Sequence, residues 1–327
     1  MNRVRLDGLD GLRGIAALCV LLTHVFPRVG SCAYLGVDFF FMLSGYVMAR
    51  SYEAGHLAPH KDHGARRAGS RAFIVVRLRR LCPTVFLCGF FGLPWVMLQP
   101  ASVNPVYVAA CLAFPFLLSL PVWSIGAELF ANFTHATVLA RLATPRLMLL
   151  VALLFAGLAL FVVRDGSIGV MNGQTGWTAV ALRTLVSYGA GIVLYRSWRD
   201  RPPFRIGAAF TWGAMPVFIA LASLLPAGRG VSDLVFVLVL CPLLIAGGLD
   251  NGQGSRLARS AGALSFPLYA AHAPALVSLQ AFGFGWQWQL VGGFGAGVLA
   301  WAISDRARRL HRSPRPGGHM RTRQVQA

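Results

Sequence analysis

The sequence predicts an all-α membrane protein, a polytopic helical bundle of about ten transmembrane helices with both termini in the cytoplasm. Of its 327 residues, 56% are hydrophobic and only 13% are charged, whereas soluble domains carry about a quarter charged residues. Apolar runs that approach the roughly 20 residues needed to cross a bilayer recur from Gly11 to Ile303. We therefore expect one transmembrane domain at residues 1–304, followed by a basic, disordered cytoplasmic tail at residues 305–327.

Hydropathy and charge together set the expected number of crossings. If the stretch 103–142 makes one net crossing, with a re-entrant piece at 115–121, nearly all of the 30 Lys and Arg residues lie inside. Two crossings there would place more of them outside than inside, against the positive-inside tendency. Ten net crossings are thus expected from eleven apolar segments, which cover residues 12–28, 33–50, 73–99, 103–121, 123–142, 146–163, 176–197, 205–226, 231–249, 262–282 and 286–304.

The formal net charge of +19 does not indicate a nucleic-acid partner. The basic residues lie in the loops between apolar segments and in the tail, for example in the connector 51–72, and they form no patch interleaved with aromatic residues. The six cysteines form no CxxC pair and no metal-like spacing, so no metal cofactor is expected. Membrane topology and anionic lipid explain the charge better.

Ionisable side chains inside the apolar segments are the functional candidates, because charge in hydrocarbon is costly unless it is paired or solvated. Arg13 and His24 stand 11 residues apart in one expected helix, so they face the same side with a rise of about 16 Å between them. That span suits an extended ligand with an anionic end at Arg13 and a reactive end at His24. The alternative is a surface anchor at Arg13 and an interhelical hydrogen bond at His24. The other candidates are Asp38, Glu128, His135, Arg183 and His272.

Glu128 starts an apolar segment, and His135 follows on nearly the same helix face. A buried carboxylate needs a partner, which an imidazole or an arginine could supply; the alternative is a helix-start glutamate with Ser124 as the cap. Arg77, Arg79 and Arg80 precede Pro83 and could grip phosphates, or could anchor the segment as positive-inside charge. We expect structural roles for Asp38, at the outer end of its segment, and for Arg183, which could snorkel or pair internally.

Together these residues resemble the acyltransferase 3 family of integral-membrane O-acyltransferases. Residues 6–17 followed by His24 are similar to the family's opening signature, an arginine and a histidine separated by ten residues, and residues 36–46 are similar to its second-span motif. The basic stretch 77–83, the Trp-Ser-Ile element at 123–125 with Glu128, and the stretch 264–272 resemble three later elements. Two departures are Ala131 and Asn132, where an aromatic residue is common, and the absence of a glutamate-proline ending after Ala302.

The resemblance implies an enzyme of the bacterial inner membrane that transfers an acyl group, acetyl in the first instance, from acyl-CoA to a hydroxyl. The acceptor would be an envelope polysaccharide or a lipid-linked sugar. His24 would be the catalytic histidine, as general base or through an acyl-imidazole, with Arg13 and Glu128 beside it. Donor-binding residues would be Arg77, Arg80, Trp123 and Ser124. The rival hypothesis is a multi-span transporter or flippase, which would move its substrate without releasing CoA.

Overall fold

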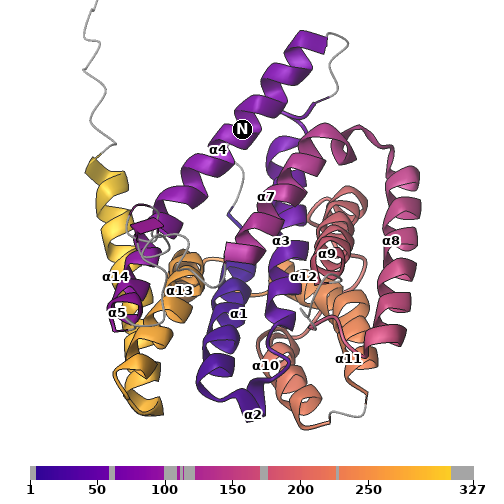
Figure 1. The fold of residues 1–327 in the computed structure, drawn as a ribbon. Coiled ribbons are helices and arrows are strands. Elements are labelled where there is room, and N and C mark those ends of the chain that lie inside the picture. The colour runs from indigo at the N-terminus through magenta and orange to yellow at the C-terminus, as the bar shows by residue number, and fades with distance from the viewer. Residues whose placement is uncertain are drawn as a thin grey trace, which may run out of the picture.

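The computed structural model contains helices and connecting loops, and no strand, in its described residues, which are 5–58, 63–98, 109–110, 113, 122–169, 176–225 and 228–310. Figure 1 shows the bundle, with α8 and α14 at opposite edges. The elements are α1 (Asp7–Val25), α2 (Pro27–Gly30), α3 (Leu35–Tyr52), α4 (His63–Gly89), η1 (Phe90–Gly92), α5 (Leu93–Met97), α7 (Val122–Thr137), η3 (Leu139–Arg141), α8 (Thr144–Asp165), α9 (Gly176–Trp198), α10 (Ala208–Leu224), α11 (Arg229–Val235), the π-helical turn η5 (Phe236–Leu240), α12 (Cys241–Asp250), α13 (Arg256–Ala281) and α14 (Trp286–Leu310).

Most of the predicted apolar segments coincide with these helices. The segment 103–121, with its re-entrant piece at 115–121, lies almost entirely outside the described residues. The basic connector expected at 51–72 is helical in its second half, because α4 begins at His63. At the other end of the chain, α14 extends to Leu310, so the first residues of the expected tail are helical, and residues 311–327 lie outside the described part.

Four helical stretches in the described part are long and apolar enough to cross a membrane: Asp7–Val25, Thr144–Asp165, Gly176–Trp198 and Arg229–Asp250. The last of these joins α11, η5 and α12, and α10 is a shorter apolar helix. The all-α fold is therefore confirmed. Ten crossings and cytoplasmic termini stay predictions.

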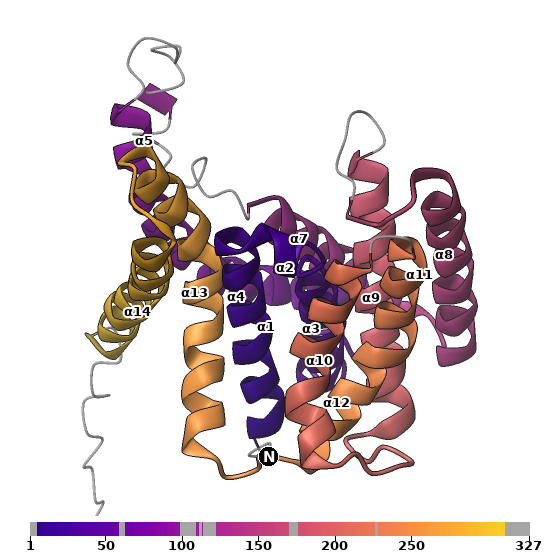
Figure 2. The ribbon, with the colours of Figure 1, turned by 90° about the horizontal axis from the view of Figure 1, so that it is seen from below.

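Helices α1 and α13 form a close parallel pair at the centre of the bundle, side by side in Figure 2. The start of α1 meets the start of α13, where Asp7 accepts a hydrogen bond of 2.9 Å from the Gly254 backbone N–H. Further along, a Cβ added at Gly14 would come within 2.6 Å of the Ala261 Cβ. Small residues thus let the two backbones approach, as in many membrane helix pairs. Because α1 carries both Arg13 and His24, this pair positions the predicted site.

A buried ion pair joins α3 to α9 near the start of α3. Asp38 and Arg183 are 0% and 1% exposed, and the Arg183 Nε lies 3.0 Å from the Asp38 Oδ1. The guanidinium also donates to the backbone oxygens of Tyr34 and Ile168. Arg183 therefore pairs internally, and Asp38 lies in the protein core and not at the membrane surface.

Candidate active site

A small cavity of about 100 Å³ lies among α1, α3, α4, α7 and α13. All five helices contribute polar side chains to its wall, and α3 contributes most of the apolar lining. The cavity brings together five of the seven predicted site residues. These are Arg13, Arg77, Arg80, Ser124 and Glu128. We call this cavity the central pocket.

Glu128 is the acidic centre of the central pocket. Its Oε1 accepts hydrogen bonds from Arg77 Nη2 at 2.5 Å and from Ser44 Oγ at 2.8 Å. Arg77 is only 4% exposed, so its charge depends on this carboxylate for compensation. Of the two partners that the sequence allowed for Glu128, the structure selects the arginine. The histidine His135 is bonded elsewhere, to Glu53 and Tyr188.

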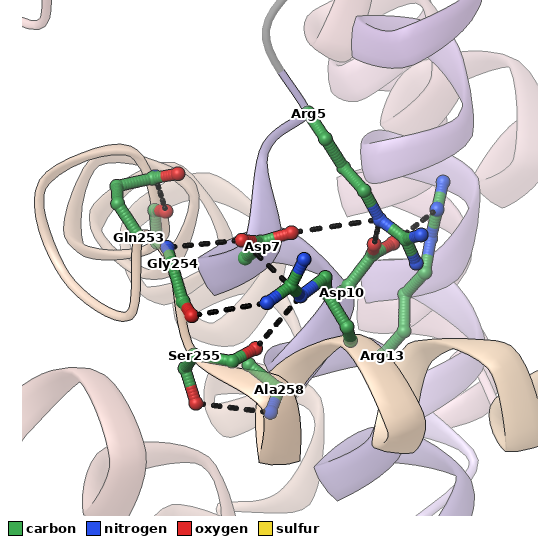
Figure 3. A network of polar contacts seen from close by, with 10 residues as sticks. Arg5, Asp7, Asp10, Arg13, Gln253, Gly254, Ser255 and Ala258 are labelled. Atoms are coloured by element: carbon green, nitrogen blue, oxygen red, sulfur yellow. Dashed lines mark hydrogen bonds and ion pairs between the residues drawn. The ribbon is translucent and has the colours of Figure 1, made fainter.

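Arg13 enters the pocket from the first turns of α1, where acidic neighbours hold it (Figure 3). Its Nη1 lies 3.3 Å from Asp10 Oδ1, and Arg5 Nε donates to the other oxygen of Asp10 at 2.7 Å. Asp7 lies 3.5 Å from the Arg5 Nε and also binds the loop before α13. This network, joined by Arg259, ties the start of α1 to the start of α13 and so fixes where Arg13 stands.

A larger and more open cavity of about 1200 Å³ adjoins the central pocket and shares Arg13 and Arg80 with it. Among the described residues, six arginines line it and Asp10 is its one acidic lining residue, so it has a strong positive potential. Guanidinium groups bind phosphate through paired N–H donors. We call this cavity the basic vestibule; its arginines are Arg5, Arg13, Arg50, Arg79, Arg80 and Arg308.

Three of these arginines were not among the candidates for phosphate binding that the sequence offered. Arg5 precedes α1, Arg50 lies in the last turn of α3, and Arg308 lies in the last turn of α14. Each is an arginine near a helix end, and in sequence that pattern is typical of positive-inside charge. Only the packing of α14 beside α4 and α1 brings the last described helix to the same cavity as the first.

His24 lies at the far end of α1 from Arg13 and lines neither cavity. It is exposed, and its Nδ1 lies 2.8 Å from the Val20 backbone oxygen. Because a carbonyl oxygen only accepts, Nδ1 carries the hydrogen and Nε2 of the neutral ring keeps its lone pair. That tautomer is the one a general base needs at Nε2.

Tyr269 links the central pocket to the region of His24. Its ring lines the pocket and packs on Phe40, with centroids 5.5 Å apart, and its hydroxyl lies 2.6 Å from Ser124 Oγ. On its other side, one helical turn later, the ring centroid of His272 lies 5.8 Å away. His272 in turn contacts His24 at 5.0 Å. Two α13 residues thus join both ends of the predicted site.

Trp123 is placed in a different hollow from the other predicted donor-binding residues. It lines an apolar groove between α7 and α9, together with Phe130 and Trp177. The Arg183 guanidinium lies 5.8 Å from its ring centroid. Its neighbour Ser124 faces the central pocket, so α7 presents consecutive residues to two cavities.

A family model described as an acyltransferase domain matches residues 6–305, nearly the whole chain. The chain belongs to the acyltransferase 3 family. Membership of this family, together with relatives named as O-acetyltransferases, supports an O-acyltransferase enzyme that uses an acyl donor. Among the described residues of this acyltransferase, no group of three or more His, Cys, Asp or Glu side chains could hold a metal ion.

Curated relatives share parts of this acyltransferase. "Protein 2 in picA locus" of Rhizobium radiobacter is 32% identical over 168 residues, which cover 44% of the chain and 87% of the relative. "Putative peptidoglycan O-acetyltransferase YrhL" of Bacillus subtilis is 37% identical over 28% of the chain and 14% of its own length. A Staphylococcus aureus protein named "Putative O-acetyltransferase" is 26% identical over 62% of the chain. The match spans only 36% of that protein, and no solved structure is similar to the acyltransferase.

Proposed function

We propose that this acyltransferase transfers an acetyl group from acetyl-CoA to a hydroxyl of an envelope polysaccharide or a lipid-linked sugar. The observation that carries the proposal is the basic vestibule, which opens onto the central pocket at Arg13, on the same helix as His24. The relatives named as O-acetyltransferases, one of them for peptidoglycan, favour acetyl as the group and a glycan as the acceptor.

The donor's phosphates would bind in the basic vestibule. Arg79, Arg80 and Arg308 supply guanidinium groups there, and among the described residues no hydrogen bond or ion pair occupies them. The phosphates of an acyl donor would therefore meet guanidinium N–H groups that are free to bind them. Arg13, shared by both cavities, stands where the donor's arm would enter the central pocket. The arm would then extend along α1 toward His24, over a rise of about 16 Å.

His24 would act as the general base of the transfer. Its Nε2 lone pair takes the proton of the acceptor hydroxyl while the hydroxyl oxygen forms a bond to the thioester carbonyl carbon. The carbon–sulfur bond then breaks, and the CoA thiolate receives the proton back from His24. Ser124 and Glu128, which line the central pocket, would orient the donor between the arginines and the base.

We place the enzyme in the bacterial inner membrane as a multi-pass protein with ten crossings and cytoplasmic termini. In this topology the basic vestibule faces the cytoplasm, where acyl-CoA is made, and His24 lies near the opposite side, where an envelope glycan is found. The positive-inside distribution of the arginines supports this orientation.

Reconstitution in liposomes tests the proposal. Purified native protein is given radiolabelled acetyl-CoA and an envelope-glycan extract, and CoA release and label on the glycan are measured beside His24→Ala and Arg13→Ala. We expect label on the glycan with the native protein only. If the native protein releases no CoA while unmodified glycan crosses the vesicle wall, the transporter hypothesis replaces the acyltransferase mechanism.

A further inference from the structure

A second histidine, His272 of α13, supports His24 from inside the bundle. The two ring centroids lie 5.0 Å apart with the ring planes at 67°. His272 is completely buried, whereas His24 is exposed. His24 is therefore the ring that a substrate can reach, and His272 is the ring behind it.

Hydrogen bonding fixes where the hydrogen sits on His272. Its Nδ1 lies 3.1 Å from the Leu268 backbone oxygen, which only accepts, so Nδ1 is the donor. Nε2 of the neutral ring then bears a lone pair. Among the described residues this atom is buried without any hydrogen-bond partner.

Packing alone does not explain an imidazole at this position. A buried nitrogen without a partner costs free energy that a phenylalanine would avoid. The neighbouring α13 residues are small and buried, and within the described part of the chain the His272 ring contacts only the rings of His24 and Tyr269. The small buried residues are Ala270, Ala271, Ala273 and Ala275.

We propose that His272 is a positioning residue for His24. The edge-to-face contact holds the plane of the His24 ring so that Nε2 faces the acceptor hydroxyl. When His24 takes the hydroxyl proton, the neutral His272 ring with its free lone pair stabilises the imidazolium beside it. The inference rests on the proposed role of His24 as base. The vestibule arginines, which would bind the donor phosphates, lie at the other end of α1. We therefore expect His272 to affect the chemical step and not donor binding.

Two substitutions separate this role from packing. His272→Phe keeps an aromatic ring in the contact but removes both nitrogens, whereas His272→Gln keeps a polar acceptor. In liposomes with radiolabelled acetyl-CoA and glycan extract, we expect His272→Phe to lower kcat by about tenfold or more while KM for acetyl-CoA stays within about twofold. His272→Gln should recover part of the lost kcat.

His135→Phe is the matched control, because His135 is the other completely buried histidine among the described residues and lies outside both cavities. It should lower thermal stability in detergent and leave kcat per folded molecule unchanged. Native kcat in His272→Phe, or a His272→Gln variant no better than His272→Phe, would overturn the positioning role. Full activity in His24→Ala would instead overturn the proposed function itself, and the two failures are therefore distinguishable.

Discussion

At the scale of single residues, Glu128 and Arg77 form the charge pair on which the central pocket depends. One carboxylate oxygen, Oε1, accepts hydrogen bonds from both Arg77 and Ser44, so this oxygen is committed to bonding within the protein. Removing one member of a buried pair leaves the other charge uncompensated, which costs more than the pair contributes.

Glu128→Gln should therefore weaken both fold and function. It leaves the buried Arg77 guanidinium without its counter-charge, a loss of about 3–5 kcal/mol for a fully buried pair and less here because Glu128 is 20% exposed. The expected result is a lower melting temperature in detergent and a lower kcat/KM. Unchanged values of both would show that the pair contributes nothing. Ser44→Ala, which removes only a neutral donor, is the milder control.

Glu53 gives the molecule a predictable response to acid. Burial alone would raise the pKa of Glu53, but hydrogen bonds from His135 and Arg196 outweigh it and hold the pKa below its ordinary value. Because the pKa of Glu53 is lower in the folded state than in the unfolded state, its ionisation stabilises the fold at pH values above the unfolded-state pKa of about 4.3. This contribution is lost as the pH falls through the folded-state pKa.

The melting temperature of native protein should thus fall as the pH drops below about 4.3. Glu53→Gln should melt at a lower temperature at neutral pH and should lose less between neutral and acidic pH than the native chain. The measurement is thermal unfolding in detergent across that pH range. Parallel curves for the two proteins would contradict the linkage.

At the scale of elements, the seam between α1 and α13 decides whether the site exists. Both helices run in the same direction, and their contacts begin at Asp7 with Gly254 and reach His24 with His272. Any side chain that separates them moves the two histidines apart as well.

Gly14→Ala tests this seam. The added Cβ would lie 2.6 Å from the Ala261 Cβ and 3.2 Å from its backbone, so the helices must shift. We expect lower thermal stability and lower kcat. Gly213→Ala in α10 is the matched control, since its Cβ would meet nothing within 4 Å and alanine is favoured over glycine in a helix by about 1 kcal/mol. A fully active, equally stable Gly14→Ala variant would mean that the seam is adaptable.

At the scale of the whole molecule, the basic vestibule brings together the beginning and the end of the described bundle. Arg5 comes from before α1 and Arg308 from the last turn of α14, with α3 and α4 between them. Clustered arginines raise the local concentration of an anionic ligand, and salt screens this effect.

Arg308→Gln should therefore raise KM for acetyl-CoA several-fold and leave kcat nearly unchanged, and the difference from native should shrink at high salt. Arg164→Gln, at an exposed arginine that lines neither cavity, should change neither constant. Steady-state kinetics at two salt concentrations measure both. A fall in kcat at constant KM would place Arg308 outside donor binding.

Much of the fold could be predicted from the sequence, because apolar runs of membrane length report helices directly. The convergence of Arg13, Arg77 and Glu128 was also predictable, through motifs that resemble those of the family. The unpredicted features are tertiary: Arg308 reaches the vestibule only because α14 packs near α4. Likewise His272 meets His24 only because α1 and α13 share a direction and a starting level, which no local pattern specifies.

Arg13 and His24 lie in one uninterrupted helix, α1, which fixes the distance between them. A helix is stiff along its axis, so the distance from the phosphate-binding end to the base is fixed by the number of turns. The enzyme would in this way measure the arm of its donor. A donor shortened between its phosphates and its thioester would still bind through its phosphates. Its carbonyl carbon would not reach His24, so the shortened donor would act as a competitive inhibitor of the native donor.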